Sequence, residues 1–258
     1  MTRDSKSLSQ ARYSQFAEGY VTSETHAHGS DLERLLAIAQ PRKHWQALDV
    51  ATGGGHTALK FAPHVEHVIA SDLTPRMLES ARRFIAERGM DNVSFRQADA
   101  ENLPFDREQF DLVCCRIAPH HFPDAQRFLL ECARVLKSGG LLMLQDHLLP
   151  FDDQAARYID AFERLRDPSH NRAFNQVEWT QMCVRAGFTV EYSEGYRKAH
   201  DFLSWARRQE PDAATIAGLI DRMRSAPPIA RDWMNPQHWG SPLATFENRH
   251  ILIRARAS

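Results

Sequence analysis

Residues 47–57 read ALDVATGGGHT: a short apolar run, then consecutive glycines, then the start of a helical pattern. Glycines suit a tight turn in which the backbone approaches a ligand, because no Cβ stands in the way. The spacing of Gly53, Gly55 and Ala58 also fits the dinucleotide fingerprint, which is weak evidence when it stands alone. The stretch predicts a buried strand and a nucleotide-type turn, and a plain strand-to-helix turn is the other interpretation.

Short apolar runs alternate with helical patterns after this turn. Further runs lie at 65–70, 93–95, 110–115 and 141–145. We expect one helix from Pro75 to Gly89 and another that opens at Asp124 and runs through Leu136 to Gly139. The alternation predicts an α/β fold in which crossover helices cover the faces of a parallel sheet.

Helical patterns also flank this region. The first forty residues are expected to be mostly helical, with a capping box at Ser30 and Glu33 and a stop at Pro41. After Pro150 the patterns predict helices at about 153–166 and 176–186, and strands near 188–193 and 246–255.

The connection between the two late strands, about 196–243, is too long for a plain loop. It holds Trp205, Trp233 and Trp239, so we expect it to have structure of its own, as a lid or a dimer surface. The expected organisation is a single domain over 1–258, with a helical cap at 1–44, a cofactor-binding core at 45–150, and a C-terminal half at 151–258 that carries this insertion.

The composition is that of an ordinary globular protein. The 258 residues are 43% hydrophobic and 25% charged, with a formal net charge of -1, which excludes a disordered chain and the basic footprint of a nucleic-acid binder. No apolar stretch approaches the roughly 20 residues of a membrane helix, and no secretory pattern opens the chain. We expect a cytoplasmic protein without stable membrane insertion, whose four cysteines are reduced core thiols; its oligomeric state is not predicted.

Acidic residues at the ends of the expected strands point to a nucleoside ligand. The run HVIASD ends in Asp72, where a carboxylate can accept hydrogen bonds from the ribose hydroxyls of NAD or of S-adenosylmethionine. Asp49 precedes the glycines, where a carboxylate attracts the ammonium of a methionine moiety and repels a pyrophosphate. Asp99, past the third strand, suits the exocyclic amine of adenine, or is a solvated loop acid. The set favours S-adenosylmethionine.

Taken in order, DVATGGG, ASDLTPRML, ADAENLPF, FDLVCCRIAPHHF and VLKSGGLLML resemble the successive motifs of class I S-adenosylmethionine-dependent methyltransferases. The resemblance covers about residues 45–147. It is nearest to the small-molecule enzymes of the methyltransferase-11 type, which include the ubiquinone and menaquinone C-methyltransferases. Ala51 stands where many members have the first glycine, a departure that the quinone branch shares. The resemblance implies a Rossmann-like, doubly wound seven-stranded sheet of order 3-2-1-4-5-7-6 with strand 7 antiparallel.

The resemblance also implies S-adenosylmethionine as cofactor, S-adenosylhomocysteine as product, and a role for each matching residue. The methionine end would lie against Asp49, Gly53 and Gly55, the ribose against Asp72, the adenine faces against Leu73 and Met77, and the adenine edge against Asp99 and Ala100. Arg116 matches a position whose backbone usually closes over the cofactor.

Methyl transfer from a sulfonium mainly requires that two reactants be aligned, and a base is needed only when the acceptor must lose a proton. His120 and His121, in RIAPHHFPD, are the candidate catalytic bases; the other interpretation is that one packs against the first helix and the other is a solvated cap neighbour. Residues expected to orient the acceptor are Tyr20, His28, His147, Arg166 and His170. An Arg and a His there suit an anionic or phenolic group, although an Arg-rich helix end also has a structural explanation.

We expect no metal. His26 and His28 form a His-x-His pair, but no further ligand with fixed spacing is visible near them. Metal-dependent catechol methyltransferases use acidic ligands after the fourth strand, and this chain has His120, His121 and a single Asp124 there.

The expected activity is methyl transfer to a small molecule, aromatic or heterocyclic, which is also the only expected partner. The alternatives are a quinone-pathway C-methyltransferase and a non-catalytic S-adenosylmethionine-binding protein. An NAD-dependent oxidoreductase lacks support because the chain has no Tyr-x-x-x-Lys relay. An RNA or protein methyltransferase lacks an Asn-Pro-Pro-Tyr or Pro-Cys segment after the fourth strand.

Overall fold

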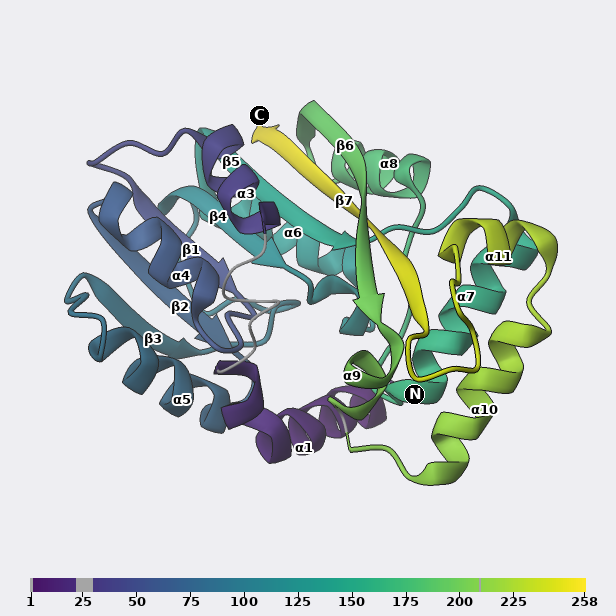
Figure 1. Ribbon diagram of the computed structural model, residues 1–258. Coiled ribbons are helices and arrows are strands. Elements are labelled where there is room, and N and C mark those ends of the chain that lie inside the picture. Colours follow the sequence, from purple (N-terminus) through teal and green to yellow (C-terminus); the bar gives the residue numbers. More distant parts are fainter. Residues whose placement is uncertain (1, 22–29, 209) are drawn as a thin grey trace.

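The computed structural model describes residues 2–21, 30–208 and 210–258 and contains a seven-stranded sheet (Figure 1). Its strands are β1 (Gln46–Val50), β2 (His67–Asp72), β3 (Val93–Gln97), β4 (Phe110–Arg116), β5 (Leu136–His147), β6 (Phe188–Asp201) and β7 (Thr245–Ala257). Their order is β3-β2-β1-β4-β5-β7-β6; β1 to β5 pair in parallel, and β7 runs antiparallel to β5 and β6. The predicted order and the single reversed strand are confirmed.

Helices cover both faces of this sheet, and others pack beside it. The α-helices of the described residues are α1 (Thr2–Val21), α3 (Ser30–Ala39), α4 (His56–Phe61), α5 (Pro75–Ala86), α6 (Ala125–Val135), α7 (Asp153–Arg166), α8 (Gln176–Arg185), α9 (Phe202–Arg207), α10 (Ala213–Arg224) and α11 (Pro228–Met234). Asp124 caps α6 by accepting the Arg127 amide, and Asn175 with Glu178 forms the predicted capping box of α8. The capping box expected at Ser30 depends on a side chain outside the described residues.

Two apolar clusters lie on opposite faces of the sheet. On one face α3, α4 and α5 bury Leu35, Phe61 and Ile85 against strand residues such as Cys114. On the other face α6 and α8 pack against residues such as Cys115, and the fully buried side chains there include Phe128 and Trp179. Cys114 and Cys115 face opposite sides because side chains alternate along a strand. All four cysteines are free and buried, as expected of core thiols.

Two boundaries differ from the sequence predictions. Helix α6 ends at Val135 rather than running to Gly139, because Leu136 is extended and pairs with Phe110 of β4. Strand β6 continues to Asp201 rather than ending at 193. Its second half pairs only with β7 and is polar on both faces, so it carries no apolar alternation to reveal it. The insertion therefore begins at residue 202, not at 196.

The insertion, 202–244, forms a small helical layer at the end of the β6–β7 hairpin, as the prediction that it has its own structure required (Figure 1). Helices α9, α10 and α11 pack with α7 around a third apolar cluster. Trp205 stacks on Phe162 with ring centroids 5.5 Å apart, and the Trp239 indole N–H donates to the Ile220 carbonyl. Hairpin residues 245–249 extend past the carboxyl end of β5, so this layer stands beside that edge of the sheet.

Helix α1 runs along the same edge, between α5 and α9 in Figure 1. Both ends of the predicted cap, the N-terminal helix and the insertion, therefore border the edge at which the parallel strands end. Within the described parts of the chain, none of the helices combines the length and the apolar character that crossing a bilayer requires.

The packing of Gly55 gives a prediction about stability. Gly55 has φ +85°, and an added Cβ would lie 3.0 Å from Ile85 Cδ1 and 3.1 Å from Ala81 Cβ on α5. Gly89 has φ +71° with open space around it. Gly55→Ala should lower the free energy of unfolding by about 2–4 kcal/mol, since it combines backbone strain with overpacking. Gly89→Ala, which adds strain alone, should cost about 1 kcal/mol. Urea denaturation compares the two, and equal losses would contradict the close packing of Gly55.

Candidate active site

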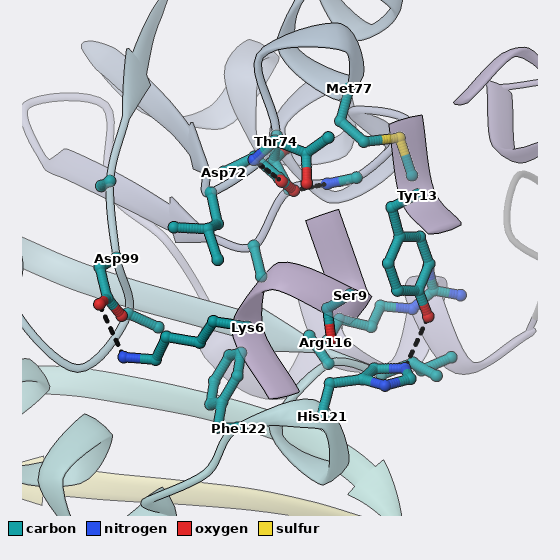
Figure 2. A pocket seen from close by; sticks show the side chains of 18 of the residues that line it. Lys6, Ser9, Tyr13, Asp72, Thr74, Met77, Asp99, Arg116, His121 and Phe122 are labelled. Carbon is teal, nitrogen blue, oxygen red and sulfur yellow. Dashed lines mark hydrogen bonds and ion pairs between the residues drawn. The ribbon is translucent and has the colours of Figure 1, made fainter. Parts of the chain in front are cut away.

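A cavity opens where the strand order reverses between β1 and β4, at the carboxyl ends of the strands, which is where open α/β sheets bind ligands. The loops after β1, β2, β3 and β4 and one face of α1 line this first cavity (Figure 2). Its lining residues are Lys6, Ser9, Tyr13, residues 51–54, His56, Thr57, residues 72–74, Met77, residues 98–101, residues 116–118 and residues 121–123.

Asp72 joins two of these loops. Its Oδ2 accepts the Gly53 amide at 3.0 Å and its Oδ1 accepts the Thr74 amide at 2.8 Å. Burial raises the pKa of this carboxyl, and the amides partly oppose that shift. A carboxylate has lone pairs for more than two donors, so Asp72 can still accept from a ligand in the cavity. Gly53 beside it has φ +52° and no neighbour within reach of a Cβ, which leaves the backbone open to the cavity.

Asp49 and Gly55 lie behind the cavity wall. Asp49 Oδ2 accepts the Thr52 hydroxyl at 2.5 Å and the Ala58 amide at 3.0 Å, which ties the glycine turn to the start of α4. Burial raises the pKa of Asp49 to about 7. The other residues predicted to hold the cofactor all line the first cavity: Gly53, Asp72, Leu73, Met77, Asp99, Ala100 and Arg116.

Helix α1 closes over the cavity through residues that the sequence did not identify. Lys6 Nζ lies 2.7 Å from Asp99 Oδ2 and 2.6 Å from Glu101 Oε2, and Figure 2 shows its ammonium reaching Asp99. Burial disfavours the Lys6 charge, but the two carboxylates outweigh burial and raise its pKa. These contacts join residues more than ninety positions apart, so no local sequence pattern predicts them.

A second cavity adjoins the first. Tyr13, Ile117 and His121 line both cavities and form the boundary between them. His121 Nδ1 lies 3.0 Å from the Ser169 carbonyl, and its Nε2 lies 2.6 Å from the Tyr13 hydroxyl. A carbonyl only accepts, so Nδ1 carries the proton and Nε2 accepts from Tyr13. The remaining lining residues are His120, His147, Arg166, Asp167, Lys198, His200, Trp205, Arg208, Asn248 and His250.

The second cavity is basic, and its polar side chains are buried or half-buried. Burial lowers the pKa of each lining histidine, to about 3 for His200 and His250, so these imidazoles are neutral at pH 7. Among the described residues, the ring nitrogens of His250 and the Nε of Arg166 have no hydrogen-bond partner. Buried polar atoms without protein partners are usually satisfied by water or a ligand, so the lining is suited to a polar occupant.

The two predicted bases differ in the cavities that they line, and most of the predicted orienting residues lie close together. His121 lines both cavities, whereas His120 lines only the second. His147 and Arg166 line the second cavity, and His170 lines a third, smaller cavity that it shares with His147. The side chain of Tyr20 and the whole of His28 lie outside the described residues.

A buried ion pair fixes α3 to the strand ends beside the first cavity. Arg116 donates from Nη2 (2.8 Å) and Nε (3.2 Å) to Asp31 Oδ2, and the Gln145 amide donates to the same oxygen at 2.7 Å. Lys198 Nζ lies 3.8 Å from Asp31 Oδ1. Burial raises the pKa of Asp31, but Arg116 and Lys198 outweigh it and hold that pKa well below its ordinary range.

Comparisons by family model, by sequence and by structure all match this chain to proteins of one kind. A family model described as a methyltransferase domain matches residues 48–144. The uncharacterized methyltransferase YcgJ of Bacillus subtilis is 36% identical over 220 residues, 85% of this chain and 87% of its own. A demethylmenaquinone methyltransferase of Clavibacter sepedonicus is 29% identical over 188 residues, 71% of this chain and 74% of its own. The solved structure of BH2331 from Bacillus halodurans has a TM-score of 0.84 at 39% identity and covers 88% of this chain and 99% of its own.

The ion pair gives a prediction about stability and pH. At pH 7, Asp31→Asn should lower the free energy of unfolding by about 3 kcal/mol, because it leaves Arg116 buried without its counter-charge. The folded pKa of Asp31 lies below its unfolded value, so the stabilisation is complete above about pH 4 and is lost as the pH falls further. Urea denaturation should therefore show the gap between wild type and variant narrowing below pH 4. A difference in the free energy of unfolding that does not change with pH, or an equal loss in the exposed-site control Asp91→Asn, would contradict the account.

Proposed function

The chain belongs to the class I methyltransferase family, in its methyltransferase-11 branch, and from that premise we propose that it transfers a methyl group from S-adenosylmethionine to a small anionic acceptor. The observation that carries the proposal is the pair of adjoining cavities. One lies at the carboxyl ends of β1 to β4, and the other opens beyond Tyr13, Ile117 and His121.

The first cavity suits the cofactor. Asp72 can accept the ribose hydroxyls while it holds the Gly53 and Thr74 amides, and Leu73 and Met77 offer apolar contacts to adenine. Asp99 and Ala100 can meet the adenine edge, and the Gly53 backbone the methionine end. Asp49 acts indirectly in this proposal, by bracing the glycine turn.

The charges in this cavity favour a sulfonium cofactor over a dinucleotide. Asp72, Asp99 and Glu101 all line it, and its two cationic side chains are paired, Lys6 with Asp99 and Arg116 with Asp31. An acidic wall attracts the ammonium and sulfonium charges of S-adenosylmethionine and repels a pyrophosphate.

The second cavity suits a small acceptor with negative charge. Arg166, Lys198 and Arg208 contribute positive charge, and Trp205 offers an aromatic face to a planar molecule. An uncharged quinone ring, the acceptor that relatives in the quinone pathway suggest, would gain no charge–charge attraction from these side chains. We therefore favour an anionic aromatic or heterocyclic metabolite over a quinone.

Bound S-adenosylmethionine supplies an electrophilic methyl group that needs no further activation. The chain's contribution is alignment, with the acceptor atom held at the boundary between the cavities. That methyl group would pass to a lone pair of the acceptor, and the electrons of the carbon–sulfur bond would stay with the sulfur of the cofactor. Where the acceptor carries a proton, Tyr13 and His121 can remove it: the Tyr13 hydroxyl takes the proton and passes its own to His121 Nε2. His121 is the stronger base candidate because it lines both cavities, whereas His120 lines only the second.

Titration calorimetry tests the cofactor assignment. Wild type should bind S-adenosylmethionine and S-adenosylhomocysteine with micromolar affinity and should not bind NAD. Asp72→Ala should weaken both adenosyl ligands at least tenfold, since it removes the ribose acceptor and frees two loops, whereas the exposed-site control Asp91→Ala should bind as wild type does. Wild-type affinity in Asp72→Ala would remove Asp72 from the ribose, and binding of NAD alone would overturn the methyltransferase proposal.

Turnover tests the proton relay. With an acceptor found by screening anionic and neutral aromatic compounds for S-adenosylhomocysteine release, Tyr13→Phe and His121→Ala should each lower kcat roughly 100-fold for an acceptor that must lose a proton. The affinity for S-adenosylmethionine should change little. His64→Ala, at an exposed site, is the control. Replacing His120 and His121 together should lower kcat no further than His121→Ala does. Full activity in that double variant would dismiss both histidines as bases.

A further inference from the structure

Three histidines from distant segments converge between the second and third cavities. His120 lies on the 3-10 turn after β4, His147 is the last residue of β5, and His170 follows α7. One ring nitrogen of each lies within 4.8 Å of those of the other two. The ring centroids are 4.4 Å apart for His120 and His147, 5.2 Å for His120 and His170, and 6.3 Å for His147 and His170.

These spacings fit a shared metal ion. Zinc binds imidazole nitrogen at about 2.0–2.1 Å, which puts each ring centroid about 3.2 Å from the ion. At the tetrahedral angle two such rings have centroids about 5.2 Å apart. The pair His120 and His170 already has this spacing, whereas the 4.4 and 6.3 Å spacings to His147 require that ring to shift when an ion binds.

Carboxylates already orient two of the rings. Asp146 Oδ1 lies 2.5 Å from His120 Nδ1, and Asp160 Oδ1 lies 2.8 Å from His170 Nε2. Asp160 is itself held by the Ala173 amide at 3.0 Å. A metal-binding histidine typically donates its second N–H to a carboxylate, which fixes the tautomer and points the other nitrogen at the ion. Here that leaves Nε2 of His120 and Nδ1 of His170 to bind.

The charged groups near the three rings already have protein contacts. Asp146 lies against His120 and Asp160 lies against His170. Of the cations in the second cavity, Arg166 lies 3.9 Å from Glu163 Oε2 and Lys198 lies 3.8 Å from Asp31.

We propose that His120, His147 and His170 bind one divalent transition metal ion of the zinc class, with an open coordination position toward the second cavity. Three imidazoles and one open position are the donor set of an ion that also binds an exchangeable ligand. His120 and His147 line the second cavity, so that ligand is the anionic group of the acceptor. This role rests on the proposed function, whereas the binding of metal does not. The sequence predicted no metal because His26 and His28 have no further ligand at fixed spacing and because few acidic residues follow the fourth strand. His147 and His170 join His120 only in the folded chain.

Metal binding is measured first. Chelator-treated protein should bind one equivalent of Zn²⁺ with micromolar or tighter affinity by competition with a chromophoric chelator, and Co²⁺ should give visible absorption bands of a site with nitrogen ligands. His147→Ala and His170→Ala should each weaken Zn²⁺ at least 100-fold, and Asp160→Asn roughly 10- to 100-fold. His200→Ala, which removes another buried histidine of the same cavity, should bind Zn²⁺ as wild type does. Unchanged affinity for S-adenosylmethionine shows that a variant is folded.

The same preparations separate this proposal from the proposed function. Absence of stoichiometric Zn²⁺ binding in a wild type that binds S-adenosylmethionine overturns the metal site alone, as does Zn²⁺ binding that survives His147→Ala. Zn²⁺ binding without S-adenosylmethionine binding overturns the methyltransferase proposal alone. Should the variants fail to fold, X-ray absorption at the zinc edge of the wild type still decides, since the site requires three nitrogen ligands at about 2.0 Å. With an acceptor in hand, removal of the metal should raise the acceptor KM and leave the cofactor affinity unchanged; an unchanged KM would overturn the role given to the open position.

Discussion

The reversal of strand order between β1 and β4 is the constraint on which the rest of the structure depends. The chain leaves β1 toward α4 on one face and leaves β4 toward α6 on the other, so the two connections diverge and leave a crevice at the carboxyl ends of the strands. Polar residues end or follow these strands: Asp72 on β2, Arg116 on β4 and His147 on β5. The two cavities lie at this edge, because the faces of the sheet are covered by apolar packing.

Burying so many polar groups has a cost, and the fold offsets it with specific partners. Asp72 holds two backbone amides, and Asp31 is held by Arg116 and Gln145. These bonds also join segments that must stay together around a ligand: the two loops at the first cavity, and α3 with the strand ends. Among the described residues, buried polar atoms without a protein partner include three side chains of the second cavity, those of Arg166, His200 and His250. A cavity whose polar atoms lack protein partners is where an exchangeable polar ligand gains most.

Patterns local in the chain predicted the fold well. The alternation of apolar runs with capped helices predicted a parallel sheet covered by helices. The resemblance of the successive motifs to a known family implied the strand order and the seven cofactor-site residues that line the first cavity. The predictions failed where local pattern carries no signal. The second half of β6 is polar on both faces, and its residues Lys198 and His200 line the second cavity. Helix α6 ends at Val135 because Leu136 pairs with β4, a tertiary contact. Lys6 and Tyr13 reach the site across more than ninety residues, and the histidine cluster combines residues up to fifty positions apart.

The central claim is that cofactor and acceptor meet at the boundary formed by Tyr13, Ile117 and His121. A crystal structure of the protein with S-adenosylhomocysteine tests it most directly. The account predicts adenosine in the first cavity, its ribose hydroxyls on Asp72, and its sulfur facing the second cavity across that boundary. A sulfur directed away from the boundary, or a ligand bound elsewhere, would contradict it.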